Sequence, residues 1–129
     1  MIAEIKSDDR LVALLVDTAD IEDGTHPVRD SKESLQMLMM KRQKGHVFAK
    51  HTHAVIDRAT HTLQEAIVVT KGKVLVTVCK RDGADVGAYE VGAGQCLYLI
   101  DGGYKIEVLE EAHFYEFKNG PHLDDKVLL

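Results

Sequence analysis

The sequence lacks any long apolar segment. The longest fully apolar run extends only from Leu11 to Val16, whereas a membrane-spanning helix needs about 20 apolar residues. The N-terminus, MIAEIKSDDR, has neither the basic start nor the apolar stretch of a signal peptide. We therefore expect no contact with a membrane and a cytoplasmic location.

Clusters of basic residues are also missing. The formal net charge is −5, and the sequence contains no basic block and no basic amphipathic helix. Nucleic acid is therefore not expected as a partner. The 129 residues are enough for one compact domain with one hydrophobic core. We expect this core to cover residues 35–117, preceded by an N-terminal extension over residues 1–34.

Cysteine is scarce, and no CxxC pair occurs. Cys79 and Cys96 each lie within an apolar, strand-like run, VLVTVC and QCLYLI. Such thiols in a cytosolic protein are usually reduced and buried. Their spacing is not that of a metal site, so both cysteines are expected in the core.

What the sequence does contain is a regular succession of turn signals, which lie at residues 44–45, 71–72, 82–83, 92–94, 101–103 and 119–121. Short runs rich in Val, Ile, Leu, Tyr and Phe separate them and predict strands. The expected strands are residues 35–40, 47–53, 65–70, 73–79, 87–91, 96–100, 105–109 and 113–117. The third and fourth should form a hairpin closed at Lys71-Gly72. This rhythm predicts an all-β sandwich or barrel.

The histidines His51 and His53 are two residues apart. On a strand, such residues point to the same face, so their imidazoles can converge. Glu65 opens the next expected strand, and an antiparallel neighbour would bring its carboxylate opposite them. Two histidines and one carboxylate suit Zn, Fe, Mn, Ni or Co and leave positions open for water or substrate. The alternative is that the two histidines are solvated polar surface.

These residues also carry a resemblance to the first motif of the cupins, which are small jelly-roll β-barrels. That motif is a glycine, five residues, His-x-His, a short gap, a glutamate, six residues and a glycine. Here five residues separate Gly45 from the pair His51 and His53, and six separate Glu65 from Gly72. The gap between His53 and Glu65 has eleven residues, where the motif has three or four. Within this insert, residues 54–64, the segment 54–63 is expected to form a mobile flap over the mouth of the barrel.

The second cupin motif is eroded. Its form is a glycine, five residues, Pro-x-Gly, two residues and a histidine. Gly94 and Gly102 fit the two glycines, whereas Ile100 replaces the proline. Lys105 stands where the fourth metal ligand is expected, or Tyr104 if the loop is one residue shorter. The resemblance implies an antiparallel jelly-roll (cupin-like) β-barrel with a small-molecule pocket.

Further side chains are candidates for this pocket. Lys105 would be a poor metal ligand but could pair with Glu65 and replace the metal charge. Tyr104 could bind a metal as a phenolate or serve as a general acid. Arg58, in the insert, could hold an anionic substrate. Gln64 either orients a ligand or caps the strand.

Three functions fit this sequence. The first is a metal-binding cupin, which as an enzyme would be an oxygenase, an isomerase or a lyase using a divalent transition metal. The second is a metal-free cupin that acts on nucleotide-linked sugars through histidine and tyrosine acid–base chemistry, as the resemblance implies for some small cupins. The third is a non-catalytic module that binds a metabolite or a metal. A homodimer is expected, because the apolar runs LVALLV and LQMLMM exceed what one small barrel needs.

Overall fold

The protein is built entirely from β-strands and connecting segments. The computed structural model describes residues 1–129. Its strands are β1 (Ile2–Ser7), β2 (Arg10–Asp17), β3 (Gly24–Pro27), β4 (Leu38–Lys41), β5 (Glu65–Cys79), β6 (Asp85–Gly92), β7 (Gln95–Leu99) and β8 (Gly103–Lys118). None of its elements is a helix long and apolar enough to cross a membrane. The expected all-β class is confirmed.

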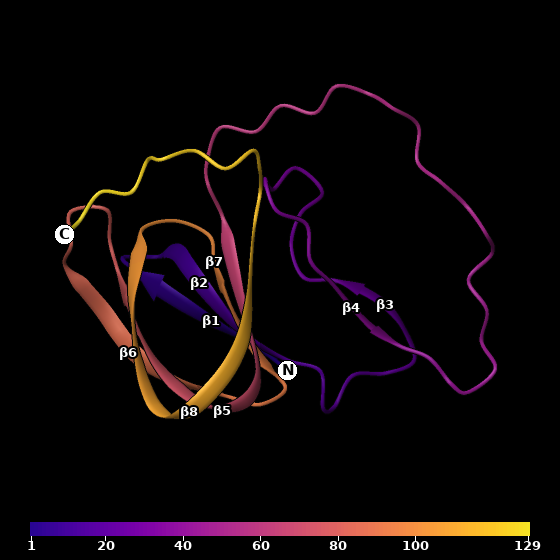
Figure 1. The fold of residues 1–129 in the computed structure, drawn as a ribbon, viewed down its shortest axis with the longest axis horizontal. Coiled ribbons are helices and arrows are strands. Elements are labelled where there is room, and N and C mark those ends of the chain that lie inside the picture. Colours follow the sequence, from indigo (N-terminus) through magenta and orange to yellow (C-terminus); the bar gives the residue numbers. More distant parts are fainter.

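The main sheet is antiparallel and strongly curled, so that it forms a half-barrel (Figure 1). Its strand order is β1-β2-β7-β5-β6, and β8 pairs with the other edge of β5. The start of β5, Glu65–Val68, pairs with β7, and its end, Lys73–Cys79, pairs with β6. β8 follows β5 along its whole length, from Lys118 opposite Glu65 to Gly103 opposite Cys79. β5 and β8 therefore run through both walls of the half-barrel, which agrees with the expected antiparallel barrel.

The bend in β5 occurs at the turn signal Lys71-Gly72. The pairing with β8 shifts in register at several points between Val69 and Val74, and Gly72 has a φ of +75°. Such bulges bend a strand and increase its twist without reversing its direction. The predicted hairpin closed at Lys71-Gly72 is therefore wrong: residues 65–79 form one bent strand. The expected strands 105–109 and 113–117 are likewise two halves of β8.

The two faces of the sheet carry separate hydrophobic clusters, because successive residues of a strand point to opposite faces. Ile67, Val69 and Val76 belong to the cluster inside the half-barrel, and Tyr104 packs against it. Ala66, Cys96 and Tyr98 belong to the cluster on the outer face. That outer cluster also takes in Ile21, Val28, Leu35, Met37 and Met39, from the segment that carries β3 and β4. Both faces of this part of the sheet are thus covered.

The N-terminal residues are part of the barrel. β2 pairs with β1 on one side and with β7 on the other, so residues 2–17 are not an extension to the core. The apolar run Leu11–Val16 is largely buried within the chain itself. This burial removes one of the two reasons for expecting a dimer.

The expected burial of the cysteines is confirmed, since Cys79 and Cys96 are both free and buried.

Residues 42–63, here called the arm, leave the barrel and return to it without forming a strand (Figure 1). The predicted strand over residues 47–53 is therefore absent. At one end Gln43 Nε2 donates to Asp23 Oδ1 at 2.8 Å. At the other end Asn119 Nδ2 donates to Thr60 Oγ1 at 2.9 Å. All residues between 44 and 62 are exposed, so the expected flap extends into solvent and does not cover the barrel.

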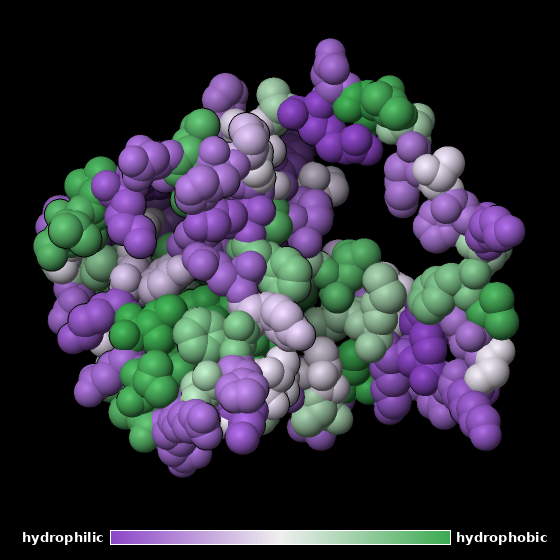
Figure 2. Space-filling view, viewed as in Figure 1, coloured by the Kyte–Doolittle hydropathy of each residue, from purple (hydrophilic) through white to green (hydrophobic).

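The outer edge of β8 has no neighbouring strand, because β8 pairs only with β5. Several apolar side chains along β8 are exposed, namely Val108, Leu109, Phe114, Tyr115 and Phe117. Figure 2 shows hydrophobic residues on the face of the barrel that carries β5 and β8, and mostly hydrophilic residues on the arm. The half-barrel is open along this edge.

Candidate acid–tyrosine site at the barrel mouth

Four side chains from β5 and β8 meet at one end of the half-barrel. Glu65 is the first residue of β5 and lies opposite Lys118, the last residue of β8. Both share the inward face with Ile67 and its partner Glu116, because residues two apart on a strand point the same way. Tyr104, at the start of β8, lies opposite Val78, which is buried inside the half-barrel.

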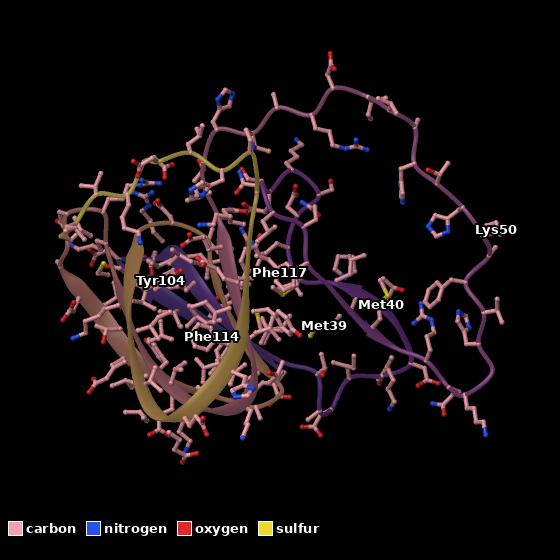
Figure 3. All side chains as sticks on the ribbon, in the orientation of Figure 1. Met39, Met40, Lys50, Tyr104, Phe114 and Phe117 are labelled. Atoms are coloured by element: carbon pink, nitrogen blue, oxygen red, sulfur yellow. The ribbon has the colours of Figure 1, made fainter.

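The curl of β8 brings its two ends together across the half-barrel. The Tyr104 hydroxyl donates a hydrogen bond to Glu116 Oε1 at 3.0 Å, although the two residues are 12 positions apart on the same strand. A straight strand of that length would separate them by about 40 Å. In Figure 3, Tyr104 lies within the curve of β8.

One ammonium group completes this arrangement. Lys118 Nζ lies 3.7 Å from Glu65 Oε1 and 3.9 Å from Glu116 Oε1. The Glu65 side chain is 15% exposed, whereas those of Glu116 and Lys118 are 40% and 35% exposed. We call Glu65, Tyr104, Glu116 and Lys118 the mouth cluster. It combines two carboxylates, one phenol and one ammonium group, of which Glu65 is the most enclosed acid.

The environment changes the proton affinity of two of these groups. Burial raises the pKa of Glu65, and the neighbouring Glu116 raises it further, while Tyr104 and Lys118 oppose the change. Burial also raises the pKa of Tyr104, and the negative charges of Glu65 and Glu116 add to this effect. Tyr104 is therefore a protonated hydrogen-bond donor at neutral pH. Glu65 binds a proton more readily than an ordinary glutamate does.

Sequence reasoning had selected two members of the mouth cluster, Glu65 and Tyr104, and missed the other two. Lys105 was the expected cation, but it lies opposite Thr77 and is exposed, on the face of β8 that points away from Tyr104. Lys118 provides the ion pair with Glu65 instead. The missed signal is the alternation in Phe114–Lys118, FYEFK, where Glu116 and Lys118 share one face and two aromatic residues share the other.

The histidines lie elsewhere. His51 and His53 are exposed residues of the arm, with ring centroids 5.4 Å apart. His51 Nδ1 lies 2.7 Å from the carbonyl oxygen of Ala49. Glu65 is on the barrel, and Arg58 is on the arm without an ion pair. The structure thus does not bring the expected ligands together.

No other metal site is preformed in the structure. No three His, Cys, Asp or Glu side chains are arranged to hold one, and the Glu65 carboxylate already faces Lys118. The residues of one chain, arranged in this way, do not fit a metal. A site made of His51, His53 and Glu65 stays a prediction, and it requires the arm to approach the mouth cluster.

Gln64, next to Glu65, points to the outer face and is almost completely buried. Its Oε1 accepts hydrogen bonds from Leu35 N and from the Tyr98 hydroxyl, both at 3.0 Å. Its Nε2 donates to Glu33 Oε2 at 2.6 Å. Gln64 therefore fastens the segment before β4 to the sheet. This is a structural role, and it differs from both roles that the sequence suggests for Gln64, which are orienting a ligand and capping the strand.

A surface hollow of about 470 Å³ lies beside Gln64. Its lining contains Lys32, Glu33, Arg81 and Asp101, and Arg81 Nε donates to Asp101 Oδ1 at 2.6 Å. Glu33 pairs with Arg29, outside the lining, so Lys32 is the lining cation that has no ion pair, and one isolated lysine makes a weak site for an anionic ligand. The mouth cluster remains the stronger candidate site.

The fold and the cluster together define an all-β protein with an open antiparallel half-barrel and an acid–tyrosine site at its mouth. Comparisons with protein-family models, with curated proteins and with solved structures gave no match to this chain. The functional argument therefore depends on the geometry of the mouth cluster and on the sequence motifs.

Proposed function

We propose that the mouth cluster transfers protons to and from a small carbonyl compound bound at the open end of the half-barrel. The observation that carries this proposal is the 3.0 Å hydrogen bond from the Tyr104 hydroxyl to Glu116, next to the enclosed carboxylate of Glu65. A phenol that stays protonated and a carboxylate of increased proton affinity form a matched acid and base.

The chemistry assigns one role to each group. The Glu65 carboxylate takes a proton from the carbon beside the carbonyl group. Tyr104 donates its hydroxyl proton to the carbonyl oxygen, which gives a neutral enol. Glu65 then returns its proton to carbon, and the Tyr104 oxygen takes back a hydroxyl proton. Return to the same carbon, after the enol has turned its other face to Glu65, while Tyr104 takes the enol hydroxyl proton, gives an epimerisation. Where the deprotonated carbon carries a hydroxyl group, return to the former carbonyl carbon, while Tyr104 takes the proton of that hydroxyl, gives an isomerisation. Glu116 orients the Tyr104 hydroxyl, and Lys118 stabilises the negative charge on Glu65 before the reaction and on the tyrosinate after it.

The resemblance to small cupins suggests nucleotide-linked keto-sugars as the substrate class. Their carbonyl groups make the neighbouring C–H bonds acidic enough for a carboxylate base.

Hydrogen–deuterium exchange tests this proposal without knowledge of the final product. The protein is incubated in D₂O, in the presence of a chelator, with a panel of nucleotide-linked keto-sugars, and loss of the carbon-bound proton signal is followed by NMR. Tyr104→Phe and Glu65→Gln should each slow the exchange at least about 100-fold. Tyr115→Phe, exposed on the outer face of β8, and Glu90→Gln, exposed on β6, should leave it unchanged. Exchange that is equally fast in all variants, or binding without exchange, contradicts the proposal.

Metal binding by His51, His53 and Glu65 is a second candidate function. One observation favours it: the two imidazoles are exposed neighbours, 5.4 Å apart between centroids. Metal analysis of protein purified without chelators or a nickel column separates the two candidates. A stoichiometric transition metal that is lost in His51→Ala supports metal binding. Less than about a tenth of an equivalent, unchanged by this substitution and not restored by added metal, rejects it.

A further inference from the structure

Two unpaired parts of the chain match one another. The outer edge of β8 presents a row of backbone N–H and C=O groups with no neighbouring strand, and such an edge readily pairs with another strand. The arm contains an exposed segment, Val47–His53, with a strand-like sequence and no backbone partners. A strand formed by this segment would supply the backbone hydrogen-bond partners that the edge of β8 lacks.

We propose that residues 47–53 of a second copy of this chain pair as an antiparallel strand with the free edge of β8, and that two copies exchange their arms reciprocally. This interface does not depend on the proton-transfer reaction. It would close the open side of both half-barrels.

One register makes the facing side chains complementary. With Lys50 opposite Glu107, Ala49 lies opposite Val108, and Phe48 meets Leu109, which is the extra residue of a bulge between Val108 and Glu110. Opposite charges and apolar pairs directly across two strands stabilise a sheet. A shift of two residues would place Lys50 opposite either Lys105 or Leu109, and a shift of one residue would exchange the two faces of the strand.

The same register determines where the histidines point. His51 falls opposite Ile106 and His53 opposite Tyr104, both on the inward face of β8. The partner's arm would thus add two imidazoles to the mouth cluster. In this arrangement, the site of one copy is complete only when the other copy is present.

Charge and chain geometry favour a second copy as the occupant. The arm carries Arg42, Lys44, Lys50 and Arg58 against one acid, Asp57, whereas β8 carries Glu107, Glu110, Glu111 and Glu116 against Lys105 and Lys118. Both ends of the arm are held by its own chain, through Asp23 and Asn119. Between these anchors the arm extends away from its own β8 (Figure 1). A symmetric exchange would pair both arms with both free edges at once.

Cross-linking of two single variants tests the exchange. Phe48→Cys protein and Leu109→Cys protein are unfolded together, refolded together and oxidised. We expect a covalent dimer joined between positions 48 and 109, identified by mass spectrometry of the linked peptides. Each variant alone, and the wild-type protein with its buried Cys79 and Cys96, should give no such dimer. Ala49→Cys mixed with Leu109→Cys is the matched control, because position 49 faces the opposite side of the strand.

Two results would overturn the proposal. A disulfide within one chain of the Phe48→Cys, Leu109→Cys double variant, without cross-linking in the mixture, means that each arm docks on its own β8. The absence of both cross-links in correctly folded protein means that the arm does not pair with this edge.

A charge reversal gives an independent test, in which sedimentation measures the dimer. Lys50→Glu should weaken the dimer about tenfold, since the pair of Lys50 and Glu107 occurs twice in it. Glu107→Lys in the same chain should restore it. Neither measurement uses metal or substrate, so failure here is distinct from failure of the proposed reaction.

Discussion

Gly72 on β5 lies directly against the backbone of Glu111 on β8. A Cβ atom at Gly72 would lie 2.8 Å from the carbonyl carbon of Glu111 and closer still to its oxygen. It is this close approach that allows β5 and β8 to bend together from one wall of the half-barrel to the other.

Gly72→Ala should therefore be strongly destabilising. The substitution combines the strain of a φ of +75° with displacement of the β8 backbone, and we expect a loss of about 3 kcal/mol or more in the free energy of unfolding. Gly94→Ala is the matched control. Gly94 has a similar φ of +86° but nothing within 4 Å of its Cβ position, so only the strain of about 1–2 kcal/mol should appear. Chemical denaturation measures both, and equal losses would contradict the close approach.

Replacement of Gln64 should loosen the segment that covers the outer face. Gln64→Leu leaves Leu35 N and the buried Tyr98 hydroxyl without one of their partners, and we expect a loss of about 2–4 kcal/mol. Gln36→Ala removes hydrogen bonds that Gln36 Nε2 makes at the surface, to the carbonyl oxygens of Asp30 and Glu33, and should cost under about 1 kcal/mol. Thermal unfolding of both variants checks the difference. Similar stability of the two would mean that Gln64 is not an anchor.

Glu65 should make the stability of the protein depend on pH. Its pKa is raised above the ordinary value of 4.5 by burial, so the folded state binds the proton more tightly than the unfolded state. Stability then falls as the pH rises from about 4.5 through the raised pKa, and it levels off above that point. The difference in unfolding free energy between wild type and Glu65→Gln should follow this curve. The same difference for Glu90→Gln, at an exposed position on β6, should not follow it. A stability of the wild type that rises with pH relative to Glu65→Gln would contradict the raised pKa of Glu65.

The two thiols should resist labelling in the folded protein. Burial raises the pKa of Cys96 to about 12, and burial also raises that of Cys79. Little reactive thiolate is therefore present at pH 8. A thiol reagent should modify two cysteines rapidly in denaturant and almost none in native buffer. Rapid modification of Cys79 alone would indicate that the end of β5, beside Gly103, opens in solution.

Local patterns in the sequence predict most of the strands, because alternation and turn residues act over a few positions. The expected strand at residues 96–100 corresponds to β7, and that at residues 87–91 lies within β6. At Lys71-Gly72 these local patterns predict a hairpin that does not form. A glycine with positive φ can reverse a strand or bend it, and only the pairing with β8, where Lys71 lies opposite His113, decides between the two.

Local patterns also predict only part of the mouth cluster. Tyr104 and Glu65 stand out because of their positions in motifs. Glu116 and Lys118 join them only because β8 curls, and curvature of a strand is not encoded in its alternation pattern. For the arm, the local pattern predicts a strand that the structure does not contain. Residues 47–53 have the sequence of a strand, but a strand forms only where an edge accepts it, and in one chain this segment meets none.

The pairing of β5 with β8 also sets the order in which the chain can fold. Cys79 and Gly103 are separated by 24 positions, whereas Glu65 and Lys118 are separated by 53, and closure of the longer loop costs more entropy. The contact between Cys79 and Gly103 should therefore form first, around β6 and β7, and the two strands should then close towards the mouth. On the ribosome, both walls of the half-barrel remain incomplete until β8 emerges. Until then one edge of β5 stays open, and during that interval the nascent chain is most exposed to aggregation.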